Sequence, residues 1–367
     1  MLLSSKVLSL RDLLTNPAVA AKLDPSLWAA ASIAILLLVI AIFARRHQLS
    51  LPEIQPRTGS GPPPDCMVVI PARNEERTIG RAVQSLPRDS VIVVDDGSTD
   101  GTANVAELAG AGVVKAPKLL RGMLGKANAC AEGARLLTSR WILFADADTW
   151  YEPDFLESAI AAAEAAKVDF LSIYLRPAYE TFGARILAPY AVALYYFGLN
   201  PRASAANAFN GQCVLVKREP YEFVGGHSAI RQYFDDDLKL AALALRHRMK
   251  IGVARAYRLG HGAIAPESFT RGAHRVSLIS AWAGVRILLA ALLFFLWAPA
   301  VAWLLLHGNR YAAAALFVWP MIVLSPWYGA ALAVLAPLGI LALTPKLLAA
   351  ALHVLTGRRL EWKGRMI

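Results

Sequence analysis

The sequence predicts an α/β fold built on a mostly parallel sheet, with transmembrane helices before and after it in the chain. Between residues 66 and 260, short apolar runs alternate with segments of helical periodicity, as in strands joined by helical crossovers. The stretches 27–44 and 278–356 are nearly free of acids and long enough to cross a bilayer. At 56% hydrophobic residues, the chain of 367 residues is also too apolar for an ordinary soluble protein.

The globular region is expected in the cytoplasm, on a multi-pass protein of the cell (inner) membrane. Arg45 and Arg46 follow the apolar run 27–44, and no small-residue cleavage site is found there, so the run is an anchor and not a secretory signal. The positive-inside rule places these arginines and the region after them in the cytoplasm. We predict an N-terminal segment and anchor at 1–50, a linker at 51–65, a cytoplasmic domain at 66–260, a membrane-interface segment at 261–277, transmembrane helices at 278–356 and a basic cytoplasmic tail at 357–367.

The charge pattern leaves the number of C-terminal spans open. The run 278–306 is one candidate crossing, and the stretch 311–343 is long enough for a hairpin of two more. Three crossings place the basic tail outside, against the positive-inside rule. Either one segment is re-entrant or interfacial, or the charge rule fails for this tail.

The net charge of +11 is explained better by an anionic membrane leaflet than by nucleic acid. Aromatic residues do not alternate with basic ones in a stripe, as they do in proteins that bind single strands. Cys66, Cys130 and Cys213 have neither metal-ligand spacing nor a disulfide pattern. The composition favours a membrane protein with reduced thiols and no nucleic-acid partner, and it predicts no oligomeric state.

Two carboxylates follow the central predicted strand, 142–145, whose four apolar residues indicate burial on both faces. Ligands bind at the carboxyl ends of strands in open α/β sheets. Asp146 and Asp148 are therefore candidates to hold a divalent cation and, through it, a diphosphate. Alternatively, they form a polar turn that caps the helix beginning near Pro153.

Further strands and helices surround this one. The predicted strands are 67–71, 91–94, 113–116 and 170–175, and the predicted helices are 76–86, one ending near 109, 125–138 and 153–166. Residues 182–199 have helical periodicity but are unusually apolar and aromatic, which favours a buried or membrane-lying helix over a span.

Three more polar clusters follow strands or open helices in the same half of the sheet. Residues 71–76 and 95–98 close the first two strands, and Gly125-Lys126 opens a helix, where backbone N–H groups and a lysine suit an anion. Each cluster alone also fits a cap or a turn. Together, and in this order, they are hard to assign to capping alone.

Asp235, Asp236 and Asp237 begin a later helix. Acids in the first turn complement the helix dipole, but three in a row exceed that need and repel one another. One carboxylate kept beside others is a candidate general base.

The order of these motifs resembles that of the family-2 inverting glycosyltransferases, over residues 67–257. The matching motifs are Pro-Ala-Arg-Asn-Glu-Glu at 71–76, Asp-Asp-Gly-Ser-Thr-Asp at 95–100, Gly-Lys at 125–126, Asp-Ala-Asp at 146–148 and the acidic doublet before Leu238. Asn-Ala-Phe-Asn-Gly-Gln-Cys at 207–213, Lys217-Arg218 and Gly225-Gly226-His227 resemble the acceptor-side region of membrane-bound members. The anchor, the C-terminal segments and Trp-Lys-Gly-Arg at 362–365 are similar to hopanoid- and carotenoid-associated glycosyltransferases.

The resemblance implies a GT-A-like, Rossmann-type nucleotide-diphospho-sugar transferase fold and a role for each matching residue. Asp237 would be the catalytic base, with Asp236 as the preceding acid, and Asp148 and Asp146 would hold Mg²⁺ or Mn²⁺. The nucleotide-sugar would be bound by Pro71, Ala72, Asn74, Glu75, Asp95, Asp96, Lys126 and Asp146. The acceptor side would contain Asn210, Gln212, His227 and Arg275.

One departure bears on polymer formation. Many processive membrane synthases have Gln-x-x-Arg-Trp after the base, whereas this chain has Arg275 in register but Gly272 and Val276 in place of the Gln and Trp. The departure favours a single transfer over chain extension. Arg271, His274 and Arg275 bind diphosphate or lie at the level of the lipid headgroups.

The resemblance thus implies a membrane hexosyl- or N-acetylhexosaminyl-transferase that moves one sugar from a UDP-sugar to a hopanoid-, carotenoid- or polyprenyl-type lipid with inversion. The alternatives are a processive polysaccharide synthase and a catalytically silent membrane scaffold. Intact Asp146, Asp148 and Asp237 argue against the scaffold. A nucleotidyltransferase on a similar sheet is not expected to carry the acidic doublet. The donor sugar and the acceptor lipid are not predicted.

Overall fold

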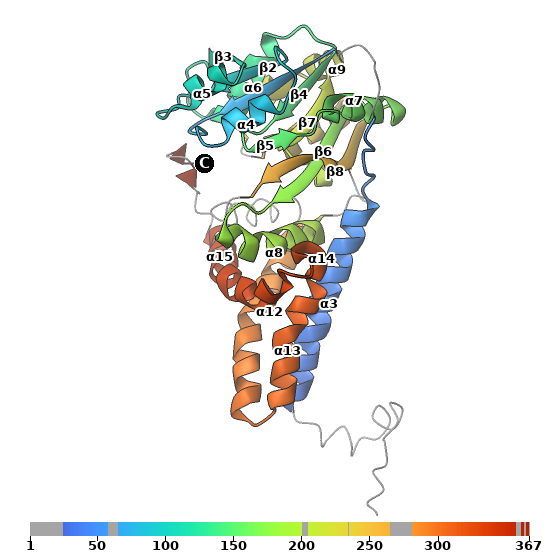
Figure 1. Cartoon of the computed structure of the whole chain (residues 1–367), viewed down its shortest axis with the longest axis vertical. Helices are drawn as coiled ribbons and strands as arrows, with labels where there is room; N and C mark the ends of the chain where they lie inside the picture. The colour runs from blue at the N-terminus through green and yellow to red at the C-terminus, as the bar shows by residue number, and fades with distance from the viewer. Residues whose placement is uncertain are drawn as a thin grey trace, which may run out of the picture.

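Two parts are stacked along the long axis of the molecule (Figure 1). A sheet with its covering helices forms one part, and a bundle of apolar helices forms the other. The computed structural model describes residues 25–57, 65–199, 205–233, 235–264, 281–356, 361–362 and 365–366.

An eight-stranded mixed sheet has the order β3-β2-β1-β4-β7-β6-β8-β5. Its strands are β1 (Cys66–Ala72), β2 (Val91–Asp95), β3 (Gly112–Lys115), β4 (Trp141–Ala145), β5 (Thr149–Tyr151), β6 (Phe170–Ala178), β7 (Cys213–Lys217) and β8 (Ile251–Ala263). The pairs β1–β2, β1–β4, β2–β3 and β6–β8 are parallel, whereas β7 runs antiparallel to β4 and β6, and β5 to β8. The predicted mostly parallel α/β sheet is confirmed.

Helices cover both faces of the sheet, as a parallel sheet requires because its strands are apolar on both sides. One core contains side chains of α4 (Ile79–Gln84), α5 (Thr102–Leu108) and α7 (Phe155–Ala165). The core on the opposite face contains side chains of α6 (Gly125–Arg135), α9 (Arg218–Phe223) and α10 (Asp236–Arg246). All five residues of β4 are buried between these layers, so the strand that precedes Asp146 is rigidly held.

Three strands were not predicted from the sequence. β5 has only three residues, β7 follows directly on the predicted acceptor-side motif, and β8 carries charged Arg255 and Arg258 among its apolar residues. They form because each pairs with a neighbour distant in sequence, which a local pattern does not report. Their pairing makes the sheet mixed.

The apolar part contains helices that extend away from the sheet and helices that lie across them. α3 (Pro25–Ser50), α12 (Ala281–Leu306) and α13 (Arg310–Val323) run side by side away from the sheet (Figure 1). α8 (Phe182–Gly198), α14 (Ser325–Tyr328) and α15 (Ala336–Thr356) lie across the ends nearest the sheet. All six share one buried core, so the amino- and carboxyl-terminal helices form a single unit.

Three segments of the described chain are long and apolar enough to cross a membrane: Pro25–Ser50, Leu288–Leu306 and Ala333–Ala350. Large apolar side chains such as Ile35, Leu289 and Phe295 are at least half exposed on the outside of the bundle. Exposed side chains of this kind suit lipid contact.

α8 forms over almost the whole stretch expected to be a buried or membrane-lying helix. Its aromatic side chains join the two parts of the molecule: the Tyr190 hydroxyl donates to the carbonyl of Ala336 at 2.8 Å, and Tyr196 hydroxyl and Tyr257 hydroxyl lie 3.0 Å apart. α8 therefore lies between the sheet and the apolar bundle.

The first residues of the predicted linker are also tied to the sheet. The Arg255 amide donates to the carbonyl of Pro52 and the Ile54 amide to the carbonyl of Arg255, both at 2.7 Å. Glu53 accepts from the Tyr257 amide at 2.7 Å. α3 is thereby connected to β8 by a short paired segment. Residues 58–64 of the predicted linker and the 265–277 part of the predicted interface segment lie outside the described residues.

Candidate active site

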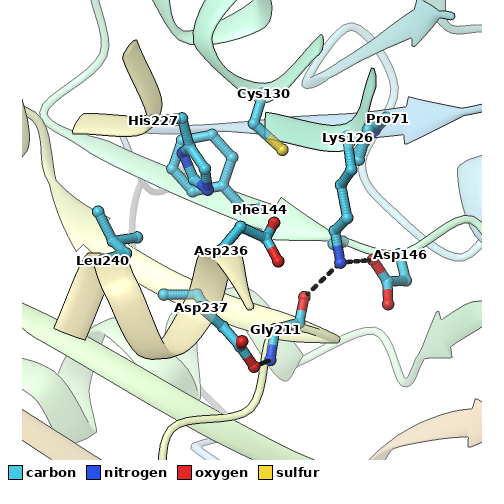
Figure 2. A pocket seen from close by; sticks show the side chains of 12 residues that line it. Pro71, Lys126, Cys130, Phe144, Asp146, Gly211, His227, Asp236, Asp237 and Leu240 are labelled. Carbon is cyan, nitrogen blue, oxygen red and sulfur yellow. Dashed lines mark hydrogen bonds and ion pairs between the residues drawn. The ribbon is translucent and has the colours of Figure 1, made fainter. Parts of the chain in front are cut away.

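A pocket lies at the carboxyl ends of β1 and β4, where α6 and α10 begin (Figure 2). Its empty volume, including space that is open to solvent, is about 300 Å³. Its lining residues are Pro71, Lys126, Cys130, Phe144, Ala145, Asp146, Gly211, Val214, His227, Asp236, Asp237 and Leu240. The structure thus brings together Pro71, Lys126, Asp146, His227, Asp236 and Asp237 of the predicted site.

Asp146 and Asp148 follow β4 in a turn that its neighbours fix. The Asp146 amide donates to the carbonyl of Gln212 at 2.9 Å, and the carbonyl of Asp148 accepts from the Ala263 amide at 3.0 Å. The alternative in which both carboxylates cap a helix is wrong: β5 follows directly, and α7 begins at Phe155 with Asp154 as its N-cap residue.

Asp148 fits a cation ligand. Its Oδ1 atom is buried and has no hydrogen-bond partner among the described residues. Burial, reinforced by the carboxylates of Asp146 and Glu75, raises the pKa of Asp148 to about 7. Such a carboxylate is stabilised by a cation. No group of three His, Cys, Asp or Glu side chains within the described ranges is arranged for a metal ion, so protein ligands alone are too few. Mg²⁺ sites commonly combine one or two carboxylates with substrate phosphates, which matches this pair.

Lys126 reaches into the pocket from the first turn of α6. Its Nζ atom lies 2.6 Å from Asp146 Oδ1 and donates to the carbonyl of Gly211 at 3.2 Å. Burial lowers the pKa of Lys126, but the carboxylates of Asp146 and Asp236 outweigh that effect, so its pKa is raised. The side chain is a cation at physiological pH.

Asp236 and Asp237 open α10 on the opposite side of the pocket, and both are buried. Asp237 Oδ2 accepts from the Gly211 amide and Oδ1 from the Leu238 amide, both at 2.8 Å. Asp236 points into the space between Phe144 and Lys126 (Figure 2). Asp235 lies outside the pocket and forms an ion pair with Lys239, their charged atoms 3.6 Å apart.

His227 is held by the core beneath the pocket. The Tyr221 hydroxyl lies 3.0 Å from its Nδ1 atom, and its ring centroid is 4.5 Å from that of Phe144. Burial lowers the pKa of His227 to about 4, against the opposing effect of Asp236. The imidazole is therefore neutral at physiological pH.

The predicted nucleotide side forms a hydrogen-bonded cluster at the ends of β1 and β2. Asp95 Oδ1 accepts from the Ser98 amide at 3.0 Å, and Asn74 Oδ1 accepts from the Thr99 amide at 2.9 Å. The Asp96 amide donates to the carbonyl of Ala72 at 2.9 Å. The Asp95 contact closes the turn after β2, so the turn interpretation holds for Asp95. The Asn74 and Asp96 contacts instead join the segment that follows β1 to the one that follows β2.

Asn210 and Gln212 belong to the loop that lies between Asp146 and the acidic pair Asp236 and Asp237. Ser172 Oγ donates to the Asn210 carbonyl at 3.2 Å and accepts from its amide at 2.8 Å, and the Asn210 side chain contacts Gln212. Neither lines the pocket. Arg275 lies outside the described residues, as do Gly272 and Val276.

Sequence reasoning gave no role to Gly211, Cys130 or Phe144, which all line the pocket. A Cβ atom at Gly211 would lie 3.1 Å from the Asp237 Cβ and 3.3 Å from its Cγ, so the absence of a side chain permits this approach. The glycine of the Asn-Gly-Gln motif was a signal that could have found it.

Comparisons with known proteins agree on one family. Residues 67–225 match the model of glycosyl transferase family 2. The 4,4'-diaponeurosporenoate glycosyltransferases of two Staphylococcus aureus strains, RF122/ET3-1 and USA300, are each 32% identical over 213 residues, covering 55% of this chain and 55% of theirs. The chain therefore spans about half the length of these curated relatives.

A solved structure shares the fold. The mannosyltransferase from Pyrobaculum calidifontis, in complex with GDP-Man and Mn²⁺, superposes with a TM-score of 0.54 at 19% identity, over 91% of this chain and 99% of that one. The chain accordingly contains a glycosyl transferase family 2 domain with a GT-A-like fold.

Proposed function

We propose that the protein is a membrane glycosyltransferase that moves a single sugar from a UDP-sugar to a lipid acceptor with inversion. The observation that carries the proposal is the pocket itself: a carboxylate from the β4 end, a lysine from α6 and two carboxylates from α10 meet within one space. A family 2 match and relatives named for a carotenoid acceptor support a carotenoid-type acceptor over a hopanoid or polyprenyl one.

The site residues have different roles in a single displacement reaction. Asp237 removes the proton from the acceptor hydroxyl, which attacks the anomeric carbon on the face opposite the nucleotide and inverts its configuration. Lys126, which is positively charged, faces the departing diphosphate. Asp148 and Asp146 would hold Mg²⁺ or Mn²⁺, which would supply positive charge as the leaving diphosphate becomes negative.

Turnover of labelled donors by membranes that contain the protein tests this proposal. We expect label from one UDP-sugar in a single extractable lipid, whose mass identifies the sugar and the acceptor. Label in insoluble polymer would instead establish a polysaccharide synthase. Donor binding without transfer would favour the catalytically silent membrane scaffold. GDP-mannose belongs among the donors, because it is the nucleotide-sugar in the mannosyltransferase complex.

The helix arrangement supports two C-terminal crossings, by α12 and α13, with α15 lying in the membrane interface. α15 lies across the bundle near the sheet rather than along α3 (Figure 1). Lys346 is near the middle of α15, where a spanning helix would expose a charge to the bilayer centre. Two crossings return the basic tail to the side of the sheet, which satisfies the positive-inside rule.

Labelling of single introduced cysteines tests this topology, since the native Cys66, Cys130 and Cys213 are buried. A membrane-impermeant maleimide added to intact cells should modify Arg310→Cys, at the exposed first residue of α13. It should modify Lys118→Cys, or a cysteine appended after Ile367, only after permeabilisation. Labelling of the appended cysteine in intact cells would show that α15 crosses the membrane.

A further inference from the structure

We propose that Lys126 is a positioning residue for Asp237 and acts on it through Gly211. This inference rests on the proposed function, because it assigns Asp237 as the base. It goes beyond the expected contact between Lys126 and the diphosphate. It places one lysine in control of the orientation of the base.

A continuous set of contacts joins the two sides of the pocket (Figure 2). Lys126 Nζ contacts Asp146 Oδ1 at 2.6 Å and the Gly211 carbonyl oxygen at 3.2 Å. The Gly211 amide in turn donates to Asp237 Oδ2 at 2.8 Å. Gly211 is thus held through its carbonyl by α6 and through its amide by α10.

Gly211 also packs directly against the base. Its Cα hydrogens face the Asp237 side chain so closely that an added Cβ would lie 3.1 Å from Asp237 Cβ and 3.3 Å from Oδ2. A displacement of Gly211 by a few tenths of an ångström therefore changes both the hydrogen bond and the packing of the carboxylate. The flanking residues hold the loop in place, because Asn210 is bonded to Ser172 and the Gln212 carbonyl accepts from the Asp146 amide.

The lysine contact is charge-assisted and partly buried, and such hydrogen bonds are stronger than neutral ones. Removal of the ammonium leaves the Gly211 carbonyl without this donor and Asp146 without its counter-ion.

Two roles for Lys126 make different predictions. A lysine that only contacts the diphosphate affects donor affinity and the stabilisation of the leaving group, and both effects are independent of the base. A lysine that positions Asp237 lowers kcat, and its effect shrinks once the base has been altered. The two roles can therefore be separated by kinetics and by a measurement without any substrate.

Hydrogen–deuterium exchange of the full-length protein in detergent, without ligand, is the first test. Lys126→Met should raise the exchange rate of the peptide containing Gly211 about tenfold or more, because a charged hydrogen bond to the loop is lost. Lys126→Arg should restore much of the protection. The matched control is Lys118→Met, which removes an exposed lysine from the preceding loop and should leave that peptide unchanged.

Steady-state kinetics with Lys126→Met, alone and with Asp237→Glu, is the second test. We expect kcat to fall at least tenfold in the wild-type background and less than threefold in the Asp237→Glu background, while UDP affinity changes by the same factor in both. An equal loss of kcat in both backgrounds, or unchanged exchange at Gly211, would overturn the inference. Absence of transfer by the wild type would refute the proposed function. The contact between Lys126 and Gly211 would then be tested by the exchange experiment alone, since that experiment needs no substrate.

Discussion

Asp237→Asn is expected to lower kcat about 10²–10⁴-fold, the usual contribution of a general base. The amide keeps the shape of the side chain and an oxygen for the Gly211 amide, but it cannot take a proton from the acceptor hydroxyl. Because Asp237 is proposed to act on the acceptor hydroxyl and not on the nucleotide, UDP should bind with unchanged affinity. Initial rates and calorimetric titration with UDP would measure the two effects separately.

Asp235→Asn is the matched control, since Asp235 belongs to the same acidic run but pairs with Lys239 outside the pocket. It should retain wild-type kcat. Asp236→Asn is informative as well, because Asp236 also lines the pocket. A decrease in kcat of about 10²-fold or more for Asp236→Asn, with a decrease of less than tenfold for Asp237→Asn, would identify Asp236 and not Asp237 as the base.

Asp148→Asn is expected to lower kcat roughly 10²–10³-fold through weakened charge stabilisation of the leaving diphosphate. The substitution removes the negative charge of a carboxylate whose buried Oδ1 atom has no hydrogen-bond partner in the described part of the chain. The Mn²⁺-dependent part of UDP affinity should fall at least about 10–100-fold, which titration of UDP with and without Mn²⁺ would measure. EDTA should reduce the wild type to the level of this variant.

Asp154→Asn is the control for Asp148→Asn, because Asp154 is the N-cap residue of α7 and its side chain makes no capping hydrogen bond. Both variants should unfold at temperatures close to that of the wild type. A wild type that keeps full activity in EDTA, or an Asp148→Asn variant with unchanged Mn²⁺ dependence, would contradict the cation site.

The strands that build the first half of the sheet were predictable because their signals are local. β1, β2 and β4 are short apolar runs, and the polar cluster that follows each run marks the end of the strand. The cluster after β4 indicated Asp146 as a site residue, and the acidic run at the start of α10 indicated Asp237. Both now line the pocket.

What could not be predicted depends on long-range pairing and on backbone contacts. β8 becomes a strand because β6 and the segment after α3 pair with it, and neither is near it in sequence. Gly211 contacts Asp237 and Lys126 through its backbone amide and carbonyl, which do not depend on the residue type. That the residue is a glycine indicates only that Asp237 approaches it closely. The position of α15 across the bundle likewise depends on packing against α8 and α12, since composition alone makes it a candidate span.

The paired segment after α3 has a consequence for how the substrates are encountered. Because Pro52 and Ile54 are bonded to β8, the sheet is not suspended on a loose tether, and its orientation follows that of α3 in the bilayer. On the proposed function, the pocket keeps a constant height and tilt above the lipid surface. The acceptor then reaches it by diffusion in two dimensions, so saturation depends on its mole fraction in the membrane, whereas the donor arrives from the aqueous phase at its bulk concentration.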